Sequence, residues 1–538
     1  MLKFLKIRVN TMNLRIGRGL ISIIILLPTS FFLNGNLVHG QNNIQIDNFG
    51  NPDQFNPSSS PLKPLNANTV PTAQSQLKAL TPQPIQQRSL KSNFLDPTAF
   101  ISVWDTALTS DDSSGNMEIH LPLMGIGTYN FTIDWGDGNS SQITDWEQTN
   151  TTHTYNAEGN YTLQITGTII GWAFNNGGDK LKILEIIQWG NLQLGNLGGY
   201  FYGSANLVIN ATDIPNLNGI TNFHNAFTGC FSLGNTGNFD SWDVSQITDM
   251  GSMFQGARTF NQSLSSWNVS KVTDMSWMFG GLYYFGYTIH PIFDKPLNHW
   301  DVSHVTDMSG MFYSSTFNQS LDQWDVSHVR YMSRMFESSS FNLPLDQWDV
   351  TSVYDMSRMF YYSSFNQPIN QWDVSHVRYM SRMFANSPFN QTLNNWDVSQ
   401  VTDMSLMFFS ATSFNQALNQ WDVSQVTTME LMLNDTSFST LNYNALLIAW
   451  AKLSLQQSVI FDVGATQYSQ SAVAAHNSII DNFSWFIHDG GMVSEVLPNS
   501  STRNTTNSKT GLGLMWVEIT LILTVIIEVR VREENKYD

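Results

Sequence analysis

The 538-residue sequence predicts a repeat solenoid, with a short strand plus a short helix in each coil, preceded by a small all-β sandwich and anchored in a membrane. Three observations predict this fold class. A motif built around WDV recurs through the middle of the chain, a region before it alternates apolar and polar residues, and both ends carry apolar runs. Hydrophobic residues make up 42% of the chain, which suffices for a long core and excludes global disorder.

The composition of the chain is acidic and poor in charge. Charged residues make up only 13%, and 43 acidic against 25 basic residues give a net charge of −18. Such a chain repels phosphate, so we expect no nucleic-acid partner. One cysteine, Cys230, excludes a disulfide framework, a cysteine-based zinc site and a lipoprotein anchor, and we expect it in the core.

The two ends of the chain predict export and anchoring. Residues 1–40 read as a signal peptide, since all basic residues of this stretch precede the apolar run 19–33 and Gln41 follows a site that signal peptidase tolerates. An uncleaved anchor helix is the alternative. Residues 512–530 read as a transmembrane anchor, for which a buried C-terminal strand is the alternative. We therefore expect a single-pass protein at the cell surface, with most of the chain outside the cell.

Two segments read as spacers. Residues 41–98 hold many proline, glutamine and asparagine residues, which predicts a disordered linker. Residues 492–511 are rich in Ser, Thr and Asn and read as a stalk before the anchor.

The region 99–170 predicts the β-sandwich. Tyr129, Phe131 and Ile133 alternate with polar residues, the DWGDG turn at 134–138 follows, and a second alternating strand begins near Tyr161. DWGDG, then HTY, then GNYTLQI resemble the polycystic-kidney-disease (PKD) type domain. The resemblance implies an immunoglobulin-like sandwich that serves as a spacer or an adhesion module. We expect Asp134 and Asp137 to bond their own turn amides and not calcium.

Residues 223–436 carry the repeats, and residues 171–222 are predicted to cap them. The tryptophans of the motif are expected to stack coil upon coil as a structural ladder, and they are Trp242, Trp267, Trp300, Trp324, Trp348, Trp372, Trp396 and Trp421. One unit reads FNQSLDQWDVSHVRYMSRMF (317–336). Its apolar spacing predicts a strand through Trp324, an N-cap at Ser327 and two helical turns to Phe336.

The repeat F-N-x-x-[LI]-x-x-W-D-V-[ST]-x-V-x-x-M-[ST]-x-M-F resembles that of the BspA-like leucine-rich-repeat surface proteins, as does the predicted C-terminal cap at 437–491. The resemblance implies a leucine-rich-repeat-like coil and an exported protein that binds host or neighbouring-cell proteins and matrix.

Repetition turns sequence positions into surface columns that are candidate sites. We expect the aspartates after each Trp to bond turn amides, with calcium bridging possible but unsupported. His304, His328 and His376 share a column with Gln, Lys and Ser, which predicts exposure and not metal binding. The sequence therefore predicts no metal site and no cofactor.

A basic patch is the candidate binding site. Arginines recur at one position of three adjacent repeats, and further arginines and tyrosines lie close to them in sequence. On the predicted helices, residues four apart share a face. The expected patch consists of Arg330, Tyr331, Arg334, Tyr354, Arg358, Arg378, Tyr379 and Arg382. A solvated face paired with local acids, such as Glu337 and Asp355, is the alternative.

These observations predict a non-enzymatic adhesion or recognition protein that binds extracellular proteins or glycans through its solenoid. No nucleophile, metalloprotease or phosphate-loop motif supports an enzyme. The alternative is a coat or sheath component that packs against its own copies. Repeated N-x-[ST] sequons are compatible with glycosylation.

Overall fold

The computed structural model describes residues 11–16, 19–24, 96–284 and 286–493. The chain divides into two compact units, Met1–Val70 and Pro71–Asp538. In the first unit, β1 (Thr11–Ile16) pairs antiparallel with β2 (Gly19–Ile24). The predicted signal peptide, linker, stalk and anchor lie wholly or largely outside the described residues. No helix in the described part of the chain is long and apolar enough to cross a membrane.

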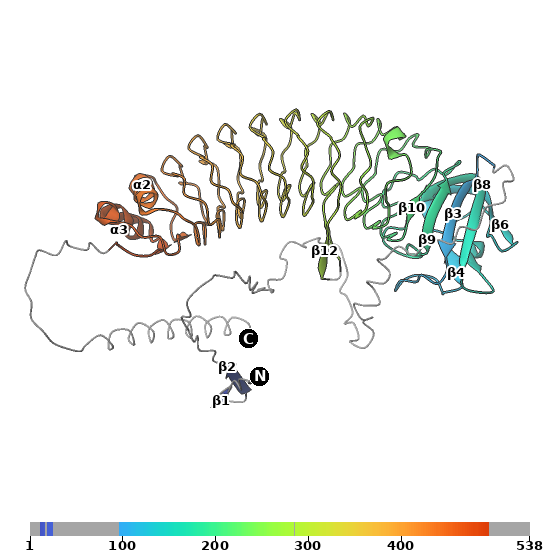
Figure 1. Cartoon of the computed structure of the whole chain (residues 1–538), viewed down its shortest axis with the longest axis horizontal. Helices are drawn as coiled ribbons and strands as arrows, with labels where there is room; N and C mark the ends of the chain where they lie inside the picture. Colours follow the sequence, from blue (N-terminus) through green and yellow to red (C-terminus); the bar gives the residue numbers. More distant parts are fainter. Residues whose placement is uncertain (1–10, 17–18, 25–95, 285, 494–538) are drawn as a thin grey trace, which may run out of the picture. The chain divides into compact units, whose positions relative to one another are not determined.

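The described part of the second unit begins with a β-sheet region, drawn in blue to green in Figure 1. Its six-stranded sheet has the order β10-β9-β3-β8-β5-β6. The strands of that sheet are β3 (Phe100–Asp105), β5 (Leu123–Asp134), β6 (Ser140–Ile143), β8 (Asn160–Trp172), β9 (Ile183–Gln188) and β10 (Val208–Ile209). A second sheet pairs β4 (Glu118–His120) with β7 (Thr152–Thr154), which follows the short 3₁₀ helix η1 (Thr149–Thr151).

The predicted hairpin and alternating strands of this region are confirmed. Asp134 and Asp137 lie in the turn between β5 and β6, and their Oδ1 atoms accept from the amides of Gly136 and Asn139, each at 2.9 Å. The sheet extends beyond the predicted boundary at residue 170, because β9 and β10 belong to it. The predicted cap at 171–222 therefore shares a sheet with the β region.

The predicted strand and helix of each coil are wrong. Among the described residues 242–284 and 286–439, the only strands are β11 (Leu282–Tyr284) and β12 (Tyr287–Ile289), a hairpin that interrupts the repeat, and there is no helix. A 3₁₀ helix, η2 (Phe239–Ser241), precedes the first of these coils. Single parallel bridges join successive coils, such as Tyr331 to Asp355.

Hydrogen bonds between coils replace the helix. The amides of Met332, Arg334, Phe336 and Ser338 donate to carbonyls of the next coil at 3.0, 2.9, 2.9 and 2.7 Å. The intervening amides close tight turns, as from Met335 to the carbonyl of Met332 at 3.2 Å. The apolar spacing that suggests a helix therefore arises from successive three-residue turns, whose period is close to the helical one. Ser327 caps no helix, because no helix follows it. Its amide and hydroxyl instead donate to Asp325 Oδ1 at 3.1 and 2.6 Å.

The tryptophan ladder is buried as predicted, with every member at most 4% exposed. Trp348, Trp372, Trp396 and Trp421 follow one another with ring centroids 6.4–6.5 Å apart and planes within 6°. Each indole N–H from Trp267 onward donates to a backbone carbonyl of the preceding coil, as from Trp372 to Leu345 at 2.9 Å. The ladder thus joins coils by both packing and hydrogen bonding.

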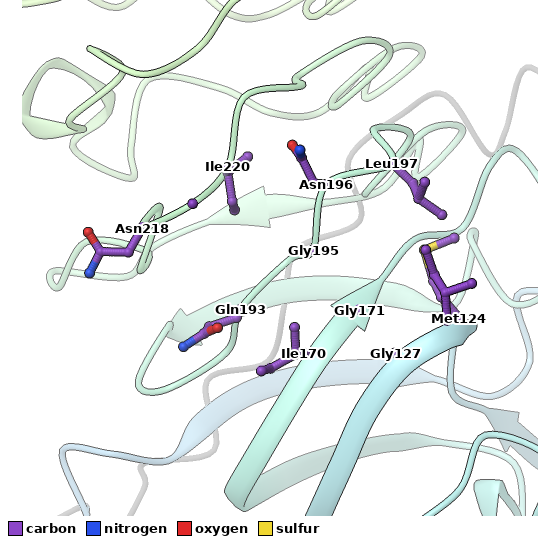
Figure 2. A pocket seen from close by; sticks show the side chains of 12 residues that line it. Met124, Gly127, Ile170, Gly171, Gln193, Gly195, Asn196, Leu197, Asn218 and Ile220 are labelled. Atoms are coloured by element: carbon purple, nitrogen blue, oxygen red, sulfur yellow. The ribbon is translucent and has the colours of Figure 1, made fainter.

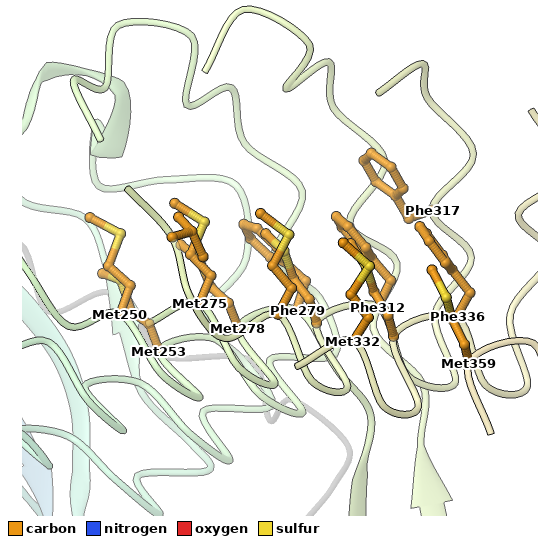
Figure 3. Packing of buried hydrophobic residues seen from close by; sticks show 14 of the residues in the cluster. Met250, Met253, Met275, Met278, Phe279, Phe312, Phe317, Met332, Phe336 and Met359 are labelled. Carbon is orange, nitrogen blue, oxygen red and sulfur yellow. The ribbon is translucent and has the colours of Figure 1, made fainter. Parts of the chain in front are cut away.

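Two columns of phenylalanine, not predicted as ladders, complete the core. In the first, Phe336 and Phe360 are 5.7 Å apart with planes 2° from parallel. In the second, Phe341 and Phe365 are 6.4 Å apart, and Phe336 also stacks on Phe341 at 4.3 Å. Figure 3 shows how buried methionines line up beside these rings. Successive layers of the array therefore bury nearly the same set of side chains, with exceptions such as Leu433 in the last coil.

A polar column runs along the array as well. The Oδ1 atom of Asn342 accepts from the amide of Asn366 at 2.8 Å, and Asn366 does the same for Asn390 at 2.9 Å. These asparagines therefore satisfy backbone groups of the neighbouring coil, which explains why the motif begins with FN.

The C-terminal segment closes the stack, at the red end of the colour scale in Figure 1. It contains α2 (Thr440–Trp450), β13 (Ile460–Asp462), η3 (Gln470–Ala472), α3 (Val473–Phe483) and β14 (Phe486–His488). Leu433 donates its amide to Asp462 at 3.1 Å, and Val463 donates to His488 at 2.8 Å. These strands continue the hydrogen bonds of the coils for two more layers.

Candidate functional site

Three arginines of the predicted patch form a column, which we call the arginine column: Arg334, Arg358 and Arg382. Their backbone is left-handed, with φ of 58°, 58° and 55°. Side chains other than glycine adopt this region at a cost of about 1–2 kcal/mol. The amides of all three donate to the next coil at 2.8–2.9 Å, so the stacking of the array holds them in this conformation.

One buried carboxyl group lies beside the arginine column. Glu337 is 5% exposed, and its Oε2 atom lies 3.9 Å from Nε of Arg334. Burial raises the pKa of Glu337 to about 7, although Arg334, Arg358 and Arg382 all act to lower it. A single carboxyl group therefore faces three guanidinium groups, and the cluster keeps a surplus of positive charge.

Tyrosines flank the arginines. The guanidinium carbon of Arg358 lies 5.9 Å from the centre of the Tyr361 ring, which is within cation–π range. Tyr331, Tyr354 and Tyr379 are 43%, 42% and 39% exposed. The rings of Tyr354 and Tyr379 meet edge to face at 5.4 Å. The surface thus offers both cations and aromatic rings.

The structure does not bring the whole predicted patch together on a helix face. Arg330 and Arg378 belong to a different column, which they share with Tyr354. The amide of Tyr354 donates to the carbonyl of Arg330, and the amide of Arg378 donates to the carbonyl of Tyr354, each at 2.9 Å. Arg378 Nη1 also donates to the carbonyl of Gln400 at 3.3 Å. The helix expected to join Arg330 to Arg334 is absent, since Arg330 precedes the bridge residue Tyr331 and Arg334 lies in a turn.

The predicted amide bonds of the aspartate column and the predicted exposure of the histidine column are confirmed. Each aspartate after a column Trp accepts from the amide two residues on, at 3.0–3.2 Å, and these are Asp243, Asp301, Asp325, Asp349, Asp373, Asp397 and Asp422. The hydroxyl and amide of Ser327 lower the pKa of Asp325. His304, His328 and His376 are exposed. Cys230 is buried, and burial raises the pKa of its thiol.

A pocket of about 270 Å³ lies where β5 and β8 approach the first turns of the array (Figure 2). Met124, Ile170, Gln193 and Ile220 line it, with several glycines. Its lining includes no titratable side chain, so its residues offer no acid, base or nucleophile.

The sequence alternative named Glu337 as an acid paired with the arginines, and its contact with Arg334 agrees with that, but the burial of Glu337 was not predicted. Glu337 follows the last Phe of its unit, where the next two repeats carry Tyr361 and Ala385. An acid at this otherwise uncharged position, one coil before Arg358, is the signal that could have identified it.

The family of the chain is shown by its repeats. The model described as "Mycoplasma protein of unknown function, DUF285" matches residues 195–292, 284–388, 338–450 and 362–475. The chain belongs to the DUF285 family. The overlapping DUF285 matches cover more than half of the 538 residues and coincide with the stacked coils. No curated protein and no solved structure matches the chain significantly.

Proposed function

We propose that this DUF285 protein is a non-enzymatic recognition protein of the cell surface that binds an acidic extracellular protein or glycan through the arginine column. The observation that carries the proposal is the recurrence of Arg334, Arg358 and Arg382 at one position of three stacked coils, beside a single buried carboxyl group. Five of the six arginines in the described range 96–493 lie between residues 330 and 382, in a chain whose net charge is −18.

Electrostatics favours an anionic partner at this place. Burial lowers the pKa of Arg358, and the neighbouring Arg334 and Arg382 lower it further. A carboxylate, sulfate or phosphate that docks here relieves this repulsion and gains charge-assisted hydrogen bonds. Arginine and tyrosine are also the residue types that dominate binding energy at protein interfaces.

The resemblances seen in the sequence support the same proposal. The BspA-like repeat and the PKD-like module are typical of exported proteins with adhesive roles. The apolar segments at 1–40 and 512–530 would export the chain and hold its C-terminus in the membrane.

The test compares the full chain with the triple variant R334S/R358S/R382S. Serine is a suitable replacement, because Ser252 occupies the same left-handed position at φ 55° in an earlier coil. Binding to immobilised heparin and to a poly-glutamate peptide is measured by surface plasmon resonance. We expect the triple variant to bind at least tenfold more weakly, and the control K271Q/K295Q, which removes two cations elsewhere on the array, to bind as the parent does.

Equal binding by the triple variant and the parent would contradict the proposal. Self-assembly of the purified chain into ordered particles without any ligand, unaffected by the triple substitution, would favour the coat alternative instead.

A further inference from the structure

A cluster of metal-ligand side chains lies at the beginning of the array, remote in sequence from the arginine column. His224, Asp249 and Asp274 come from three successive coils, and their ligand atoms all lie within 4.8 Å of one another. His224 Nδ1 is 3.2 Å from Asp249 Oδ1. Asp249 and Asp274 are partners in a parallel bridge, so the coil spacing itself sets the two carboxylates side by side.

Two linked departures from the repeat make room for the imidazole. His224 and Gly251 occupy the position that serine holds in the next six coils, from Ser276 to Ser405. A Cβ atom at residue 251 would lie 2.6 Å from His224 Nδ1 and 3.2 Å from Asp249 Oδ1. A serine at residue 251 would displace the imidazole, whereas glycine leaves the space between the imidazole and the carboxylates open.

The carboxylates are held in place by their own turns. Asp249 Oδ1 accepts from the amide of Gly251 at 2.9 Å, and Asp274 Oδ1 accepts from the amide of Ser276 at 2.8 Å. Each carboxylate keeps its second oxygen for another partner. Bonds of this kind fix the orientation of ligands around a metal ion.

The column that contains these aspartates carries repulsion that a cation would relieve. Asp307 is the next member and is the bridge partner of Asp274, so three carboxylates follow one another along the column. The side chains of His224 and Asp249 are 42% and 33% exposed, which leaves an entry path from solvent.

We propose that His224, Asp249 and Asp274 form a binding site for a divalent transition-metal ion of the Zn²⁺ class. One imidazole nitrogen and two carboxylate oxygens suit such an ion, whereas Ca²⁺ and Mg²⁺ prefer all-oxygen ligand sets. The ion clamps the first three coils of the array to one another. The site is difficult to predict from the sequence, because successive ligands are 25 residues apart and become neighbours only when the coils stack.

The test titrates the untagged full chain with ZnCl₂ in an isothermal calorimeter. We expect one saturable site with a dissociation constant in the micromolar range or below. H224Q and D274N should each weaken binding at least tenfold. G251S removes no ligand but displaces the imidazole, so it should weaken binding too. The matched control is D355N. Asp355 belongs to the same column, but its bridge partners are Tyr331 and Tyr379 and not other acids, so D355N should bind Zn²⁺ as the parent does.

Thermal unfolding without metal checks that each variant is folded. Absence of saturable Zn²⁺ binding, or equal affinity in the parent, H224Q and D274N, would overturn the site and leave His224 and Asp249 as an ion pair only. Displacement of Zn²⁺ by equimolar Ca²⁺ would overturn the assignment to a transition metal.

Discussion

Each coil of the array places non-glycine residues in the left-handed region of φ. Arg334 shares its position with Ser252, Trp277, Leu406 and Leu431, all at φ between 54° and 58°. Side chains so different have only their place in the coil in common. The turn, and not the residue type, therefore dictates this conformation, and the residue at this position is free to vary for binding.

The buried carboxyl group of Glu337 makes stability depend on pH. Its pKa is raised from 4.5 to about 7, so the folded state holds this proton more tightly than the unfolded state does. The free energy of unfolding should therefore fall as pH rises from about 4.5 to about 7, by about 3 kcal/mol from this group. Glu337→Gln should remove that part of the slope in urea unfolding measured across this range.

The exposed Glu430 supplies the control for this prediction. Glu430→Gln should keep the slope of the parent protein. A slope that is the same in the parent and in Glu337→Gln would mean that the carboxyl group is solvated or already neutralised by the arginine column.

At the scale of the element, the coil replaces regular secondary structure. Its backbone groups bond mainly to the coils before and after, and its apolar side chains stack on copies of themselves. A single coil lacks neighbours both for its backbone hydrogen bonds and for the stacking of its side chains, so it cannot be stable alone.

Removal of one ring from the tryptophan ladder tests the strength of this stacking. Trp372→Ala deletes a buried ring that packs between Trp348 and Trp396 and leaves the carbonyl of Leu345 without its donor. We expect a loss of ~3–5 kcal/mol in the free energy of unfolding by denaturant titration. Trp277 is only partly buried and packs on Tyr313 at 5.2 Å, so Trp277→Ala should cost no more than ~1–2 kcal/mol. Equal losses in the two variants would contradict the ladder.

Features that recur with the repeat can be predicted from the sequence. The backbone conformation within a coil, and residues that occur in one coil alone, cannot. The period of Trp372 and its neighbours predicts the stack, and the alternation of Tyr129, Phe131 and Ile133 predicts β5. The helix is wrong because the spacing of Met332, Met335 and Phe336 fits a run of tight turns as well as a helix. The metal-site role of His224 and the burial of Glu337 escape prediction because each residue departs from the repeat, so periodicity carries no information about them.

At the scale of the molecule, stacking makes the array continuous from the sheet to the C-terminal helices. Amides of the first Phe column donate forward without a break from Phe201 through Phe227, Phe254 and Phe279 to Phe408, each to a carbonyl of the next coil at 2.8–3.0 Å. Coils that share such bonds stabilise their neighbours, and surface columns stay in register along the whole array. The arginine column and the proposed metal site both depend on that register.

Residue-resolved hydrogen exchange of the full chain tests this continuity most directly. The amides of Phe312, Phe336, Phe360 and Phe384 should share slow exchange, at least a hundredfold slower than the amide of the exposed Asp373, because each is buried and bonded to the next coil. Exchange of these Phe amides as fast as that of Asp373, or at unrelated rates from coil to coil, would contradict a continuous stack.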